Sequence, residues 1–124
     1  MRALWFLAIA VVVAGSLLPG NSAALRWLAM LHVSDKAEHF LAYAVLAWFP
    51  GWLYSRASGL SACGMLFALG VALEIAQTAV PGRSCELMDA LADLAGVLSG
   101  FAVSAAVAAA LRTMRTGASG GSPA

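Results

Sequence analysis

Eight polar residues lie inside or beside the apolar stretches of this chain, and their side chains can bind ions, hold phosphate or exchange protons. They form three groups along the sequence: Lys36, His39 and Tyr43; Glu74 and Gln77; and Arg83, Asp89 and Asp93. A charge in a hydrocarbon interior costs at least about 2.5–3.5 kcal/mol, so a membrane segment rarely keeps such residues without a function. We therefore interpret these eight residues as a candidate functional cluster.

The spacing inside each group favours a shared helix face. Helical residues three, four or seven positions apart lie on one stripe. That spacing relates Lys36 to His39 and Tyr43, Glu74 to Gln77, and Asp89 to Asp93.

Carboxylates outnumber basic groups in this part of the chain. Only Lys36 and Arg83 are basic, whereas carboxylates come from Asp35, Glu74, Glu86, Asp89 and Asp93. Packed together, carboxylates repel one another unless one is protonated or a cation binds. The pattern predicts a site for a cationic or metal ligand, or a site coupled to proton exchange.

No established motif accompanies the cluster. No Cys/His spacing matches a zinc site, and Gly-x-Ser-x-Gly, His-Glu-x-x-His and phosphate-loop patterns are absent from the sequence. The sequence therefore assigns no resident metal, no cofactor and no catalytic residue. We interpret Cys63 as a small core residue and Cys85 as an unpaired loop thiol.

Several of these residues also have a structural interpretation. Lys36 can extend to the lipid headgroups, and Glu74 can join two helices through a salt bridge. Arg83 can contact a lipid headgroup rather than bind a phosphate or carboxylate bidentately. Acid–base chemistry on a lipid-linked substrate is a further alternative, which the sequence does not require.

The composition indicates the elements that must position these residues. The 124-residue chain is 62% hydrophobic and only 10% charged, with a mean hydropathy of +0.88. Soluble domains are roughly a quarter charged, so this composition is typical of a membrane protein. No basic run suited to nucleic acid occurs, and we expect no nucleic-acid partner.

Four apolar stretches predict an all-α bundle of four transmembrane helices, at about residues 3–18, 37–54, 60–80 and 87–111. A short interfacial helix is expected within 23–33.

Other residues predict where these helices bend, end and pack. Pro50 and Gly51 predict a kink or an end in the second stretch, and Pro81-Gly82-Arg83-Ser84 predicts a turn. Gly96 and Gly100 are expected to support close helix packing. We expect residues 1–111 to form one domain and residues 112–124 to form a disordered polar tail.

With four spans, both termini lie on one face of the membrane, and all three polar groups lie near the other face. Four arginines share the face of the termini, and Arg26, Lys36 and Arg83 share the other, which favours cytoplasmic termini by the positive-inside rule. The chain is therefore predicted to be a multi-pass protein of a bacterial cytoplasmic membrane. The first stretch also resembles a cleavable signal peptide, because Arg2 precedes an apolar run and Ser22-Ala23-Ala24 follows it.

These residues together resemble a known pattern. Asp35-Lys36-x-x-His39-Phe40-x-x-Tyr43, Glu74-x-x-Gln77, Pro81-Gly82-Arg83, Asp89 and Gly96 are similar, in order, to the VanZ-like family. The resemblance covers roughly residues 1–110 and implies a small multi-pass bacterial membrane protein whose first span is retained. The founding member is associated with low-level resistance to the glycopeptide teicoplanin. Many members carry Asn at the position of Asp93, so this chain has an additional carboxylate there.

The function expected from the sequence is that of a non-enzymatic envelope protein. Its polar cluster would bind or move an envelope component, or alter glycopeptide susceptibility. One alternative is an intramembrane enzyme acting on a phosphorylated or lipid-linked envelope precursor, with Arg83 and Lys36 holding phosphate and Glu74 or an aspartate as acid or base. Another is a scaffold in which the polar residues only join helices. The expected partners are the lipid bilayer, such a precursor or a glycopeptide, and a second copy of the chain.

Overall fold

The computed structural model describes residues 1–31 and 33–119, and every regular element in these ranges is an α-helix. The helices are α1 (Arg2–Ser16), α2 (Ala23–Ala29), α3 (Asp35–Leu53), α4 (Arg56–Gln77) and α5 (Leu87–Ser119). The predicted all-α class is confirmed. His32 and residues 120–124 lie outside the described ranges.

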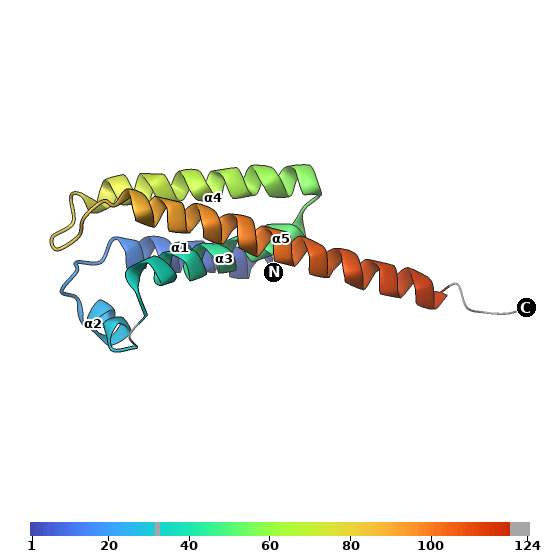
Figure 1. The fold of residues 1–124 in the computed structure, drawn as a ribbon, viewed down its shortest axis with the longest axis horizontal. Helices are drawn as coiled ribbons and strands as arrows, with labels where there is room; N and C mark the ends of the chain where they lie inside the picture. Colours follow the sequence, from blue (N-terminus) through green and yellow to red (C-terminus); the bar gives the residue numbers. More distant parts are fainter. Residues whose placement is uncertain (32, 120–124) are drawn as a thin grey trace, which may run out of the picture.

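Four helices lie alongside one another, and the short α2 lies near one end of them (Figure 1). Helix α3 makes its most extensive contacts with α5, and α1 packs on α3 and α4. The connections 17–22 and 78–86 lie at the end where α2 sits, and we call this the polar end. Helix α5 continues past the other helices at the opposite end.

Small residues allow α3 and α5 to approach closely. A Cβ atom on Gly96 would collide with the carbonyl oxygen of Phe40, and one on Gly100 would collide with the carbonyl oxygen of Ala44. Because the obstacles are backbone atoms, they cannot move aside without shifting a helix. This close contact sets the register that brings the first turns of α3 and α5 together at the polar end.

Local sequence explains where α3 and α4 begin and end. The hydroxyl of Ser34 accepts a hydrogen bond from the Ala37 amide at 3.2 Å, and Ser55 caps α4 in the same way. Helix α3 continues through Pro50 and ends at Leu53, so the predicted interruption falls within its last turn.

The core joins α1 to the other helices. Its buried members, including Tyr43 and Cys63, come from all four long helices. Inside it, the indole N–H of Trp5 donates to the carbonyl oxygen of Leu46 at 2.9 Å. Helix α1 is thus an integral part of the packed bundle.

Only α4 and α5, within the described ranges, are both long and apolar enough to cross a membrane, rather than the four spans predicted. Helix α1 has 15 residues, which extend about 22 Å. Helix α3 has 19 residues, but its first turn carries Asp35, Lys36 and Glu38. The two apolar helices α4 and α5 suggest a membrane location.

The C-terminal segment differs from the disordered tail predicted from residue 112. Helix α5 crosses that position without interruption and continues to Ser119. Alanine and arginine are favourable helix residues, and they extend α5 into a segment whose Gly, Ser and Thr content suggested a coil.

Candidate functional site

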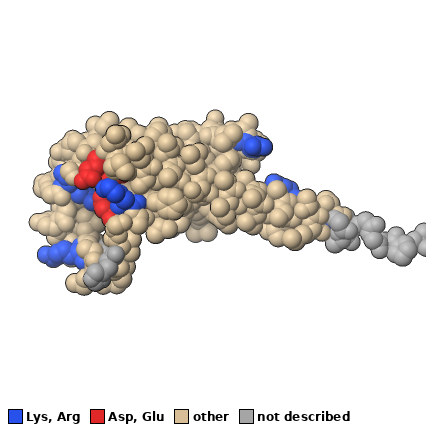
Figure 2. All heavy atoms as spheres, viewed as in Figure 1, with Lys and Arg blue, Asp and Glu red and all other residues tan. Residues whose placement is uncertain are grey.

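The eight residues singled out in the sequence lie at the polar end. Figure 2 shows acidic and basic side chains gathered there, while the middle of this face is free of charged side chains. Buried among them are Tyr43, Glu74, Gln77, Asp89 and Asp93, each at most 3% exposed. Parallel alignment of helix ends explains the gathering, because α3 and α5 begin where α4 ends.

His39 lies at the centre of the buried carboxylates. Its Nδ1 atom is 2.9 Å from Asp93 Oδ1 and 3.7 Å from Glu74 Oε1. Its Nε2 atom is 4.0 Å from Asp89 Oδ2. One imidazole thus faces three carboxylates from two other helices, and its side chain remains 14% exposed.

Lys36 forms a second contact between α3 and α5. Its Nζ atom lies 2.9 Å from Glu86 Oε2 and 3.0 Å from Asp89 Oδ1. Hydrogen bonds to Glu86 and then Asp89 raise the pKa of Lys36 above its usual value, so the amine stays charged. Lys36 therefore balances Asp89, rather than extending freely to the headgroups.

Glu74 is held in place by the backbone of the 78–86 connection. Its Oε2 atom accepts a hydrogen bond from the Glu86 amide at 3.3 Å, which leaves Oε1 directed at His39. A buried carboxylate needs such donors to remain ionised. The described contacts thus join Glu74 to both α3 and the segment leading into α5.

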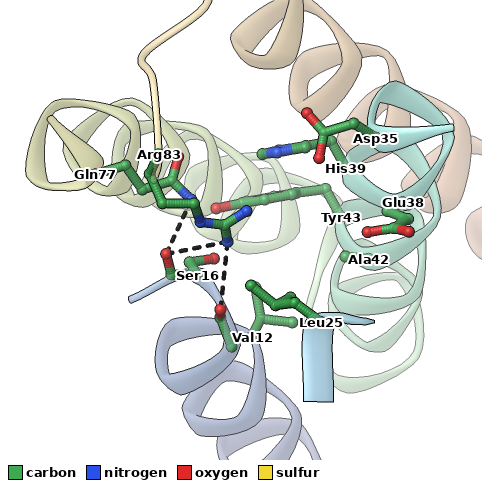
Figure 3. Close-up of a pocket in the computed structure, with 11 residues that line it drawn as sticks. Val12, Ser16, Leu25, Asp35, Glu38, His39, Ala42, Tyr43, Gln77 and Arg83 are labelled. Atoms are coloured by element: carbon green, nitrogen blue, oxygen red, sulfur yellow. Dashed lines mark hydrogen bonds between the residues drawn. The ribbon is translucent and has the colours of Figure 1, made fainter. Parts of the chain in front are cut away.

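Arg83 and Gln77 hold the end of α1 instead of facing the carboxylates. Arg83 Nη2 donates to the carbonyl oxygens of Gly15 and Ser16 at 3.4 and 3.3 Å, and Gln77 Nε2 donates to Ser16 at 3.0 Å (Figure 3). The last carbonyls of a helix lack intrahelical partners and carry partial negative charge. Arg83 therefore has a helix-capping role that the sequence analysis missed.

Two connections meet beside this cap. The Gly20 amide donates to the Pro81 carbonyl at 3.1 Å, and a Cβ on Gly20 would collide with the backbone of Gly82. Gly82 has φ +75°, a conformation that favours glycine. The predicted turn at 81–84 is thus present, and it fixes Arg83 against α1.

A cavity of about 210 Å³ opens between α1, α3 and the 78–86 connection. Figure 3 shows Arg83 and Gln77 on one side of it, Asp35 and Glu38 on the other, and Tyr43 between them. Glu38 was not predicted as a site residue, although it directly precedes His39 in the sequence. His39 lines this cavity and also contacts the buried carboxylates Glu74 and Asp93. The cavity therefore connects the buried cluster with the outside.

Some of the described side chains could hold a metal ion. Ligand atoms of His39, Glu74 and Asp93 lie within 4.8 Å of one another, and those of Asp35, His39 and Asp89 form a second such group. The first group comes from three different helices, so no local spacing in the sequence could reveal it; in the second, Asp35 and His39 lie four residues apart on α3 and Asp89 comes from α5. Cys63 is buried and Cys85 exposed, both as free thiols, away from these two groups.

Comparison of the chain with protein-family models, curated proteins and solved structures finds no match.

Proposed function

We propose that this chain is an integral membrane protein of the cell envelope that binds an envelope component through a cationic group, in the cavity at the polar end. It acts by binding rather than by catalysis. The observation that carries the proposal is the cavity itself, which has two carboxylates on its rim and lies next to a buried acidic cluster.

The apolar exterior supports the membrane part of the proposal. Beyond the two long apolar helices, α1 exposes Leu4, Phe6, Leu7 and Val11, each 59–63% exposed. Exposed apolar surface of this extent, flanked by charged ends, fits a lipid environment. We therefore propose that α1 and α3 lie in the bilayer beside α4 and α5, with both termini cytoplasmic in a bacterial inner membrane.

The short α1 is compatible with this arrangement. Its length of about 22 Å is less than the roughly 30 Å hydrocarbon thickness, and local thinning of the bilayer accommodates such a mismatch at modest cost. Helix α2 follows α1 directly and carries the exposed Trp27, a residue type suited to the headgroup region.

The rim of the cavity favours a cationic group on the ligand. Asp35 and Glu38 lie on the α3 side. Of the two basic side chains in the described lining, Arg83 is engaged with α1 carbonyls and His39 with the Asp93 carboxylate. The cavity is smaller than the roughly 300–1,000 Å³ typical of drug-sized ligands. A lipid headgroup fits this volume better than a glycopeptide antibiotic does.

The resemblance to the VanZ-like family adds a related proposal. If the chain alters glycopeptide susceptibility, the small cavity favours an indirect effect through an envelope component, rather than direct capture of the drug.

Lipid-dependent thermal stability tests the binding proposal. Purified protein in detergent containing EDTA would be melted with short-chain phosphatidylethanolamine, whose headgroup carries an ammonium, or with phosphatidylglycerol, which lacks one. The expected result is a higher unfolding midpoint with phosphatidylethanolamine only, because a ligand at 100 times its Kd stabilises by about 2.7 kcal/mol. The Asp35→Asn/Glu38→Gln double variant should lose this shift.

Glu86→Gln is the matched control, because Glu86 is acidic and close by but does not line the cavity. It should keep the shift. Equal shifts with both lipids, or an unchanged shift in the double variant, would contradict the proposal.

One observation favours an enzyme as a second candidate. The 2.9 Å contact between His39 Nδ1 and Asp93 Oδ1 resembles the carboxylate–imidazole pairs that orient a general base. Turnover of a lipid-linked precursor by purified protein, lost in Asp93→Asn, would favour this candidate over simple binding.

A further inference from the structure

We propose that His39, Glu74 and Asp93 bind a divalent transition-metal ion such as Zn²⁺. The proposed ligand atoms are His39 Nδ1, Glu74 Oε1 and Asp93 Oδ1. They come from α3, α4 and α5, so the ion would join three helices at one point. The inference does not depend on the lipid proposed above.

The separations between these atoms match the coordination sphere of such an ion. In tetrahedral zinc sites, nitrogen and oxygen ligands about 2.0–2.2 Å from the metal lie roughly 3.4 Å from each other. The His39 Nδ1 atom is 2.9 Å from Asp93 Oδ1 and 3.7 Å from Glu74 Oε1, on either side of that value. The third separation, between the two carboxylate oxygens, is at most 4.8 Å, so side-chain adjustment would bring all three atoms around one ion.

The charges around the imidazole favour a cation. Glu74, Asp89 and Asp93 are buried, and of the charged groups contacting them only Lys36 and His39 can be positive. Lys36 also contacts a fourth carboxylate, that of Glu86. A divalent ion replacing the proton between His39 and Asp93 would add positive charge where carboxylates are in excess.

The neighbouring groups are placed as those around metal-bound histidines usually are. Such a histidine directs its other ring nitrogen at a carboxylate, which fixes its orientation. Here Nε2 lies 4.0 Å from Asp89 Oδ2, beyond hydrogen-bond distance, so the ring or the carboxylate would have to shift to complete this pair. Asp89 is itself held by Lys36. Glu74 is fixed through its other oxygen by the Glu86 amide.

A hydroxyl beside the proposed ligands provides a separate indication of a bound group. Tyr43 is only 2% exposed and lines the cavity, and its hydroxyl makes no hydrogen bond to the described residues. A Cβ on Gly70 would lie 3.0 Å from this hydroxyl and 2.7 Å from Asp93 Oδ2, so the two oxygens are neighbours. Buried hydroxyls are nearly always paired. With three protein ligands on the ion, a metal-bound water in the open fourth position would supply that partner.

Metal retention by purified protein tests the proposal. Protein stripped with EDTA would be dialysed against Zn²⁺, and the metal content per chain measured by mass spectrometry. We expect one Zn²⁺ per wild-type chain, no competition from Mg²⁺, which prefers all-oxygen sites, and at least about tenfold weaker binding in Glu74→Gln and Asp93→Asn. The matched control is His32→Gln, which removes the chain's other histidine and should not change binding.

A second measurement needs no variant that might fail to fold. Co²⁺ added to the stripped wild-type protein should give the visible absorption of a tetrahedral nitrogen–oxygen site, and Zn²⁺ should abolish it by displacement. Absence of this absorption, failure to retain Zn²⁺, or equal binding by the three variants would overturn the proposal. Because the lipid assay contains EDTA, a negative result there would leave this outcome unaffected.

Discussion

Arg83 has a different role from the one its residue type suggested. An arginine beside a carboxylate cluster was interpreted as a ligand for phosphate or carboxylate, or as a headgroup contact. In the structure its guanidinium donates to the C-terminal carbonyls of α1. A sequence cannot reveal this, because the acceptors are backbone atoms 67 and 68 positions away.

We predict that Arg83→Ala loosens the end of α1. Loss of charged hydrogen bonds to a helix terminus should cost about 1.5–3 kcal/mol of unfolding free energy. The measurement is the thermal midpoint in detergent, with Arg26→Ala, on the exposed face of α2, as control. Arg83→Lys should recover part of the loss, because lysine keeps the charge but not the planar fork. Equal midpoints for Arg83→Ala and wild type would argue against the capping role.

Among the helices, the contact of α3 with α5 depends most on small residues. We predict that Gly96→Ala and Gly100→Ala each destabilise the protein by about 1–3 kcal/mol, the usual cost of overpacking, because the added methyl would meet α3 backbone atoms. Circular dichroism melts in detergent would measure this.

Gly64→Ala is the matched control for these two variants. Gly64 also lies within a helix, but a Cβ there would meet nothing within 4 Å. Its midpoint should stay near that of wild type or rise, since alanine favours helix. A loss at Gly64 equal to that at Gly96 would mean that the effect comes from helix propensity and not from packing.

The docking of α1 gives another prediction. Trp5→Phe keeps an aromatic ring but removes the N–H that donates to Leu46, at an expected cost of about 1 kcal/mol. Trp27→Phe, at a position 65% exposed, should cost less. If chemical denaturation followed by fluorescence gave the two variants equal losses, the hydrogen bond would not contribute to α1 docking.

The positions of the elements were largely predictable, and their lengths were less so. The predicted apolar stretches and the Pro81-Gly82 turn placed α3, α4 and the following turn within a few residues of their positions in the structure. Of the four predicted spans, only α4 and α5 are long and apolar enough by themselves, since α1 is short and α3 is charged at its start. The end of α5 was placed too early because Gly, Ser and Thr were given more weight than the preceding alanines.

For the whole molecule, the alternating direction of the predicted spans was enough to gather the polar residues at one end. It could not show which residue contacts which. The His39–Asp93 and Lys36–Asp89 contacts depend on how α3 and α5 cross, a property of three-dimensional packing. The resemblance to a known family rested on the same residues, and it stays a prediction.

We predict that the polar end faces away from the cytoplasm. Cys85 is exposed beside Arg83 and Glu86, whereas Cys63 is buried at 7% exposure. A membrane-impermeant maleimide should therefore label Cys85 in intact cells, and Cys85→Ser should abolish the signal. Labelling only after lysis would reverse the orientation and direct the search for a ligand to the cytoplasm.

The capping of α1 has a consequence for biosynthesis. The groups that complete its final carbonyls, Gln77 and Arg83, are translated more than sixty residues after Ser16. A nascent chain that has emerged only as far as α3 therefore carries a first helix whose terminal carbonyls still lack these donors. Completion of this cap is a late event, even though α1 can already pack on α3, and the end of α1 in chains arrested before Gln77 should be more accessible to proteases than in the full chain.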